Sequence, residues 1–111
     1  MGDRYKYSDV TGEVIKAFYR IYNTLGYGFL EKVYENALAI ELKKQELSVV
    51  QQAPIEVYYN GQSVGEYYAD LLVERKVIVE LEVAETFTDE HHAQLLNYLK
   101  VTGIQVGLLL N

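Results

Sequence analysis

The fold of this chain is decided by residues 67–83, which read YYADLLVERKVIVELEV. Two apolar runs in this stretch flank the charged triplet Glu74-Arg75-Lys76, which predicts a turn between two strands. Both runs are apolar at consecutive positions, which is typical of strands that are covered on both faces. If the two strands form a hairpin around Arg75, Asp70 faces Glu80 across it.

Outward from this hairpin, the pattern predicts an α+β domain with a helix-flanked mixed sheet. Apolar residues recur with helical spacing over 10–25 and again from about residue 30 to 44–47. Residues 49–52 are expected to be extended, Pro54 marks an edge or a strand entry, and Asn60-Gly61 predicts a tight hairpin turn between strands over 55–59 and 62–73. The remaining elements are a strand over 77–83, a helix from Thr88 or Asp89 through Leu99, and a strand over 105–110. The predicted order is ααβββαβ.

Composition bounds the class of protein. The chain has 111 residues, which predicts a single domain over 1–111 with residues 1–8 as a flexible lead-in. No apolar run is long enough for a bilayer span, the N-terminus lacks the apolar region of a signal peptide, and there is no cysteine, so we expect a cytoplasmic protein. The net charge of −6 repels phosphate backbones, so any nucleic-acid contact has to be local or assisted by metal ions.

Three acidic residues within these apolar strands indicate a site. Glu80 and Glu82 are two residues apart and therefore point to the same side of the sheet, and the hairpin register adds Asp70. A divalent cation with oxygen ligands, Mg²⁺ or Mn²⁺, would relieve the repulsion among the three carboxylates. The alternative is that the acids lie at a solvated sheet end or pair with basic residues such as Lys76, Lys100 or Arg75.

The predicted third helix carries further candidates. His91, Gln94 and Tyr98 are spaced so that they share one helix face. A helix that follows a strand often packs back over it, which would bring Gln94 and Tyr98 to the acids. Alternatively, Tyr98 is a core aromatic residue and Gln94 a surface amide.

The segment Gly28-Phe-Leu-Glu31-Lys-Val-Tyr34 has the Gly-x-x-Glu-x-x-Tyr signature of the small GxxExxY proteins. Together with YYADLLVERKVIVELEV and HHAQLLNYLKVTGIQVGLLLN, it makes the chain resemble that family from about Val10 to the C-terminus. The family is placed in the PD-(D/E)XK nuclease superfamily, close to RecB-like nucleases. The resemblance therefore implies a PD-(D/E)XK nuclease-like core.

The same resemblance implies a set of site residues. In that superfamily, a helix Glu, an Asp and a Glu-x-Lys pair build a Mg²⁺ site, and a Gln-x-x-x-Tyr helix follows. Position by position, Glu31 matches the helix acid, Asp70 the central Asp and Glu80 the first acid of Glu-x-Lys, while Gln94 and Tyr98 match the helix motif.

One position departs from this pattern, because Glu82 stands where the pattern has Lys. The Lys would help to activate the attacking water and to neutralise charge at the phosphate. Some restriction endonucleases of the superfamily carry Glu there, as a base or a metal ligand. Lys76 or Lys100 is a candidate for the missing positive charge.

Two hypotheses follow for the function. The first is a Mg²⁺- or Mn²⁺-dependent nuclease acting on DNA or RNA, in which Glu31, Asp70 and Glu80 hold the metal and Glu82 is a further ligand or base. The second is a catalytically inactive nuclease-fold module that assembles into a homo-oligomer with a structural or binding role. The eleven tyrosines favour self-association, because tyrosine is enriched at interfaces.

Overall fold

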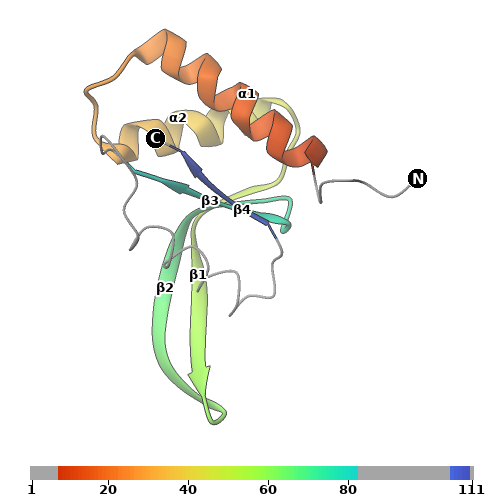
Figure 1. The fold of residues 1–111 in the computed structure, drawn as a ribbon, viewed down its shortest axis with the longest axis vertical. Coiled ribbons are helices and arrows are strands. Elements are labelled where there is room, and N and C mark those ends of the chain that lie inside the picture. Colours follow the sequence, from red (N-terminus) through yellow and green to blue (C-terminus); the bar gives the residue numbers. More distant parts are fainter. Residues whose placement is uncertain (1–7, 83–105, 111) are drawn as a thin grey trace.

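The computed structural model describes residues 8–82 and the backbone of residues 106–110. Helices α1 (Ser8–Leu25) and α2 (Glu31–Lys44) come first, followed by strands β1 (Val49–Tyr59), β2 (Gln62–Val73), β3 (Val77–Leu81) and β4 (Val106–Leu110). Figure 1 shows the helices packed beside the short strands β3 and β4, with the β1–β2 hairpin extending away from them. The predicted helix over 88–99 lies outside the described residues. α1 begins at Ser8, the last residue of the predicted lead-in, and the rest of that lead-in lies outside the described residues.

The four strands form one mixed sheet in the order β1-β2-β3-β4, which confirms the predicted sheet. β1, β2 and β3 are antiparallel neighbours, and β4 runs parallel to β3. The pairs Leu71↔Val79, Leu72↔Ile78 and Val73↔Val77 are those of a hairpin centred on Arg75, as predicted. All five residues of β3 are buried, which agrees with its uninterrupted apolar pattern.

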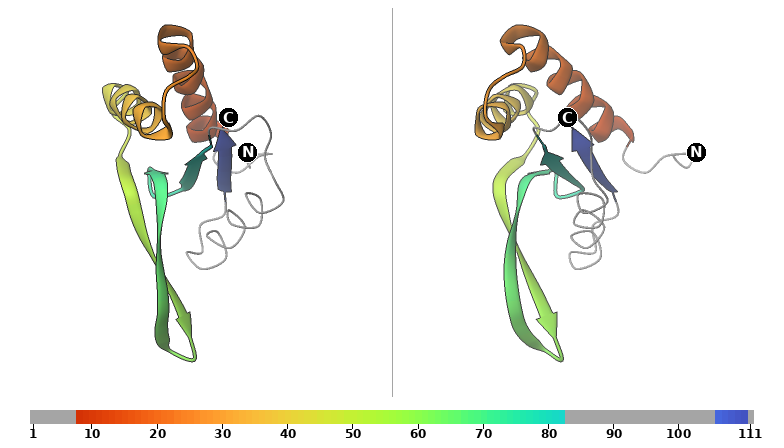
Figure 2. Two further views of the ribbon diagram at one scale, coloured as in Figure 1. Left: turned by 90° about the vertical axis from the view of Figure 1, so that its left-hand side faces the viewer. Right: turned by 60° about the vertical axis from the view of Figure 1, so that its left-hand side comes forward.

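The main core lies between the helices and one face of the sheet, as the two views of Figure 2 show. Val14 of α1 and Leu38 and Leu42 of α2 are fully buried there. They pack with Leu71, Val73, Val77, Val79 and Leu81 of the sheet. The odd-numbered residues of β3 thus face the helices, whereas Ile78 belongs to a second, smaller cluster with Ala53, Ile55 and Ala69.

The β1–β2 hairpin combines a tight turn with a register shift between Val57 and Tyr58 and an irregular point at Gln52. Asn60 and Gly61 both have positive φ, 51° and 77°, as the predicted tight turn requires. Gln52 also has a positive φ of 50°, and the register passes from Gln51↔Leu71 directly to Ala53↔Ala69. The strand pair is therefore irregular at the level of Gln52 and Asp70.

The predicted strand boundaries need two corrections. β1 is one strand from Val49 to Tyr59 that continues through Pro54, because β1 is an edge strand and a missing N–H costs no sheet bond at an edge. β3 ends at Leu81, two residues before the predicted end. In the described part of the chain, no helix is long and apolar enough to cross a membrane.

Candidate metal centre

Asp70 lies at the point where β2 separates from β3. The pairing of these strands ends at Leu71↔Val79, and two residues beyond Val79 the backbone N–H of Leu81 donates to Oδ2 of Asp70 at 2.8 Å. The Asp70 carboxylate therefore occupies a backbone hydrogen-bonding position of β3. This bond fixes the direction of the carboxylate relative to Glu80.

Glu80 is a buried carboxyl group, with 8% of its surface exposed. It alternates with Leu81 and so lies on the sheet face that carries Ile78. The pKa of Glu80 is raised to about 8, first by burial, then by the charge of Asp70 and a hydrogen bond with it, and last by the charge of Glu82. Among the residues that the structure describes, nothing donates a hydrogen bond to Oε1 of Glu80.

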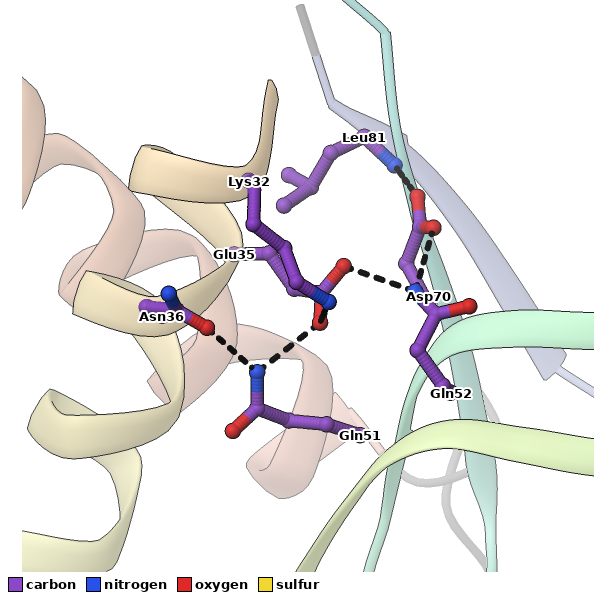
Figure 3. Close-up of polar contacts among 7 residues, drawn as sticks. All are labelled: Lys32, Glu35, Asn36, Gln51, Gln52, Asp70 and Leu81. Carbon is purple, nitrogen blue, oxygen red and sulfur yellow. Dashed lines mark hydrogen bonds and ion pairs between the residues drawn. The ribbon is translucent and has the colours of Figure 1, made fainter. Parts of the chain in front are cut away.

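A second buried acid, Glu35 of α2, faces the same level of the sheet and is 4% exposed (Figure 3). Its Oε2 accepts hydrogen bonds from Nε2 of Gln51 at 2.8 Å and from Nζ of Lys32 at 3.0 Å. Its Oε1 accepts one from Nε2 of Gln52 at 2.8 Å. Neighbouring residues of a regular strand point to opposite faces, so the positive φ of Gln52 explains how both glutamines reach one carboxylate.

Gln52 joins the two acidic groups. Its Nε2 also donates to Oδ1 of Asp70 at 3.4 Å, so one amide lies between Glu35 and Asp70. The pKa of Asp70 is raised, chiefly by burial and then by the charges of Glu35 and, more weakly, Glu31. The hydrogen bonds from Leu81 and Gln52 act in the opposite direction, because they stabilise the charged form.

The structure brings together some of the residues singled out from the sequence. Asp70 and Glu80 interact directly, and Glu82, half-buried just after β3, adds its charge to theirs. Glu31 is exposed at the first position of α2 and acts on Asp70 more weakly than Glu35 does. Gln94, Tyr98 and Lys100 lie outside the described residues.

The remaining candidate cation, Lys76, lies in the turn before β3, at the opposite end of that strand from Glu80. The four intervening steps of an extended strand separate their backbones by about 13 Å. The lysine that the structure places beside the buried acids is Lys32, through its ion pair with Glu35. Sequence reasoning did not single out Lys32.

The Gly-x-x-Glu-x-x-Tyr segment shapes the start of α2. The hydroxyl group of Tyr34 donates to the carbonyl oxygen of Gly26 at 2.6 Å and accepts from the N–H of Phe29 at 3.4 Å. Gly28 has a φ of 106°, which side-chain-bearing residues rarely adopt. Tyr34 and Gly28 thus fix the turn that sets the direction of α2, and with it the position of Glu35.

The donor set fits a hard divalent cation. Within the ranges 8–82 and 106–110, no three His, Cys, Asp or Glu side chains are grouped closely enough to form a metal site by themselves. Mg²⁺, however, is commonly held by one or two carboxylates, with water and substrate phosphate completing its shell. The Asp70–Glu80 pair supplies those carboxylates, and Oε1 of Glu80, which has no donor within the described residues, is a buried oxygen that a cation would satisfy.

The mixed sheet, the two-helix layer and this carboxylate pair together define a nuclease-like α+β domain. The family model of the PD-(D/E)XK nuclease superfamily matches residues 8–111, and the chain belongs to that superfamily. Nucleases of this superfamily generally use Mg²⁺ or Mn²⁺. Neither the curated proteins nor the solved structures contain a significant match to the chain.

The raised pKa of Glu80 predicts how stability depends on pH. The folded metal-free protein keeps the Glu80 proton up to about pH 8, whereas the unfolded chain releases it near 4.5. Unfolding between these values releases a proton, so the free energy of unfolding should fall as the pH rises, by up to about 1.4 kcal/mol per pH unit. Denaturant unfolding in the presence of a chelator measures this slope. A Glu80→Gln variant should show a flatter profile, and an equal slope in both proteins would refute the assignment.

Proposed function

We propose that this protein is a metal-dependent phosphodiesterase of nuclease type that acts on DNA or RNA. The observation that carries the proposal is the pair formed by the half-buried Asp70 and the buried Glu80, whose Oε1 has no hydrogen-bond partner among the described residues. Membership of the PD-(D/E)XK nuclease superfamily supports it. An ion pair would not account for this arrangement, because both members are acids and the charge of Asp70 raises the pKa of Glu80 beyond the effect of its burial.

In this proposal, Asp70 and Glu80 hold Mg²⁺ or Mn²⁺, and Glu31 contributes through water. The metal, when bound, supplies a Lewis acid that activates water and stabilises charge on the phosphate. The Leu81 N–H and the Gln52 amide keep the Asp70 carboxylate in place before the metal arrives. Glu80 gives up its proton on metal binding, because a ligating carboxylate has to be ionised.

The remaining residues of the proposed site serve the substrate. Glu82 acts as a further ligand or as a base, and Gln94 and Tyr98, in the roles that the family resemblance implies, orient the site. An anionic phosphodiester approaching these acids meets a negative local charge. Lys32 of α2, whose Nζ lies 3.0 Å from Oε2 of Glu35, partly offsets this negative charge.

A cleavage assay tests the proposal. Supercoiled plasmid, single-stranded DNA and single-stranded RNA are each incubated with Mg²⁺ or Mn²⁺ and with wild type, Glu80→Ala or Glu82→Lys. We expect cleavage by wild type that Glu80→Ala abolishes. Cleavage by Glu82→Lys alone would mean that the fold keeps a metal site but wild type is inactive. No cleavage by any of the three would contradict the proposal.

A second candidate function is a self-assembling module, either instead of catalysis or together with it. It is favoured by the exposed apolar residues Val33 and Ile40 of α2, which lie two helical turns apart on one face. Ile40 alone keeps 64% of its surface exposed. Exposed apolar patches of this kind are typical of interfaces.

This candidate predicts a measurable oligomer. Light scattering at micromolar concentration should give a mass above the 12.7 kDa of one chain. Ile40→Lys should shift the mass toward the monomer, because a buried charge without a partner weakens an interface strongly. Glu46→Lys, which alters an exposed residue just beyond α2, is the control and should leave the mass unchanged. A monomeric wild-type protein would exclude self-assembly through this face.

Because the chain has no cysteine, the proposal places this activity in the cytoplasm, where thiols stay reduced and disulfides are rare.

A further inference from the structure

The outer part of the β1–β2 hairpin, residues 53–69, forms an arm that extends away from the two helices (Figure 1). One face of this arm carries alternate residues of both strands, except that a register shift between Val57 and Tyr58 places Ser63, rather than Val64, opposite Tyr58. We call it the acidic–tyrosine face, and it consists of Pro54, Glu56, Tyr58, Ser63, Glu66 and Tyr68. All six residues are exposed. The opposite face, in contrast, buries Ala53, Ile55 and Ala69 in the smaller cluster.

Two like charges lie directly opposite each other on the acidic–tyrosine face. Glu56 and Glu66 are cross-strand partners, an arrangement that destabilises a strand pair. Each is held by a hydroxyl group of the same face, Glu56 by Ser63 and Glu66 by Tyr68. From Gln45 to Glu74, the sequence contains no Lys or Arg that could neutralise them.

Tyrosine rings flank this pair of acids along the arm. Tyr58 keeps 63% of its surface exposed and Tyr68 keeps 51%. Exposed tyrosines are common in recognition surfaces, because a rigid ring offers contact area with little loss of conformational entropy. An aromatic ring also attracts a cation over its face, and a neighbouring carboxylate strengthens that attraction through charge.

From these features we infer that the acidic–tyrosine face docks a basic segment of another protein, with Lys or Arg side chains placed between Glu56 and Glu66 and against the tyrosine rings. Charge complementarity favours this occupant, since the charged residues of the arm are Glu56 and Glu66 and it contains no Lys or Arg. The same charge disfavours nucleic acid and anionic lipid. A second copy of this chain, with its net charge of −6, complements the face less well than a basic protein does.

The test measures binding of a fluorescently labelled arginine hexapeptide to the full chain by anisotropy. Glu56→Gln/Glu66→Gln removes both charges while glutamine oxygens can still accept from Ser63 and Tyr68. We expect it to weaken binding about tenfold, and Tyr58→Ala to weaken it about threefold. Glu46→Gln removes one exposed acid outside the arm and should change affinity less than about twofold.

Thermal unfolding separates this role from a structural one. The double variant should melt at or above the wild-type temperature, because it relieves the repulsion between opposed acids. A marked fall in melting temperature would instead show that the two acids serve the fold. Amide shifts in NMR spectra should map the peptide to the arm.

Three results would overturn the inference. One is an equal loss of peptide binding in Glu46→Gln and in the arm variants, which would indicate attraction by bulk charge alone. Another is a wild-type oligomer that Tyr58→Ala dissociates, which would assign the arm to a second copy. The third is NMR shifts of the arm on addition of duplex DNA but not of the peptide.

Discussion

Replacing Glu80 by glutamine is expected to abolish site-specific Mn²⁺ binding and, at the same time, to make the metal-free protein more stable in mildly alkaline solution. Glutamine has nearly the same shape, so the packing around position 80 is preserved. It cannot supply the negative oxygen that a hard cation needs, which removes one of the two proposed carboxylate ligands. It also carries no charge at any pH, which removes both the cost of burying a charge and the repulsion by Asp70 that together raise the pKa of Glu80.

Calorimetric titration with Mn²⁺ and denaturant unfolding with a chelator measure the two effects on the same samples. We expect wild type to bind Mn²⁺ more tightly as the pH rises through about 8, since the metal then displaces fewer protons. Glu46→Gln, a matched change at an exposed acid, should resemble wild type in both measurements. Unchanged Mn²⁺ binding by Glu80→Gln would remove the basis of the proposed metal centre, whatever the cleavage assay shows.

The two expected effects, a gain in stability and a loss of metal affinity, have opposite signs, and this separates a metal ligand from a residue that only stabilises the fold. A residue that only serves the fold would lose stability when it is replaced, together with any function that depends on the fold. A residue kept for a cation costs stability while the cation is absent and repays it on binding. Improved stability combined with lost metal affinity would therefore distinguish a ligand from a packing residue.

Much of the fold is predictable because its signals are local. Asn60-Gly61 requires two consecutive residues with positive φ, and the structure gives both. The turn at Glu74–Lys76 fixes the hairpin register, because the residues on either side of a short turn have to pair in sequence. That register alone predicts that Asp70 and Glu80 face each other.

The part of the site contributed by α2 was not predictable in this way. Glu35 and Gln52 are 17 positions apart in the chain, and their contact depends on the positive φ of Gln52. No turn motif in the sequence predicts this positive φ. The helical periodicity of α2 does contain one signal that points to Glu35. Glu35 lies between Tyr34 and Leu38, on the face of α2 that is buried, where an unpaired acid would be costly.

The family resemblance and the structure point to different acids of α2 as site residues. The resemblance directs attention to Glu31, the acid of the signature motif. In the structure, Glu31 is exposed, whereas Glu35, one turn further along, is buried and bonded to the residue that holds Asp70. In the proposed metal centre Glu31 contributes through water, and Glu35 is the residue that connects the helix layer to the carboxylate pair.

Replacing Glu35 by alanine should therefore have the largest effect on stability of any change in the site. The substitution leaves the Gln51 and Gln52 amides and Lys32 without their shared acceptor at a buried position. Removing one partner of a buried, charged hydrogen-bond network costs about 3 kcal/mol. Glu13→Ala, which removes a half-buried acid whose ion pair with Lys16 spans 3.8 Å, should cost less than about 1 kcal/mol.

Stability alone would not show that Glu35 serves the metal centre, so the second measurement is Mn²⁺ affinity below the unfolding transition. Without Glu35, the Gln52 side chain loses its 2.8 Å anchor and is held only by the longer contact to Asp70. Loss of such an outer partner typically weakens metal binding by about 10- to 100-fold. Glu35→Gln keeps an acceptor for one glutamine and should fall between alanine and wild type in both measurements. If Glu35→Ala lowers stability but binds Mn²⁺ like wild type, Glu35 only joins α2 to the sheet, and Asp70 is positioned by the Leu81 N–H alone.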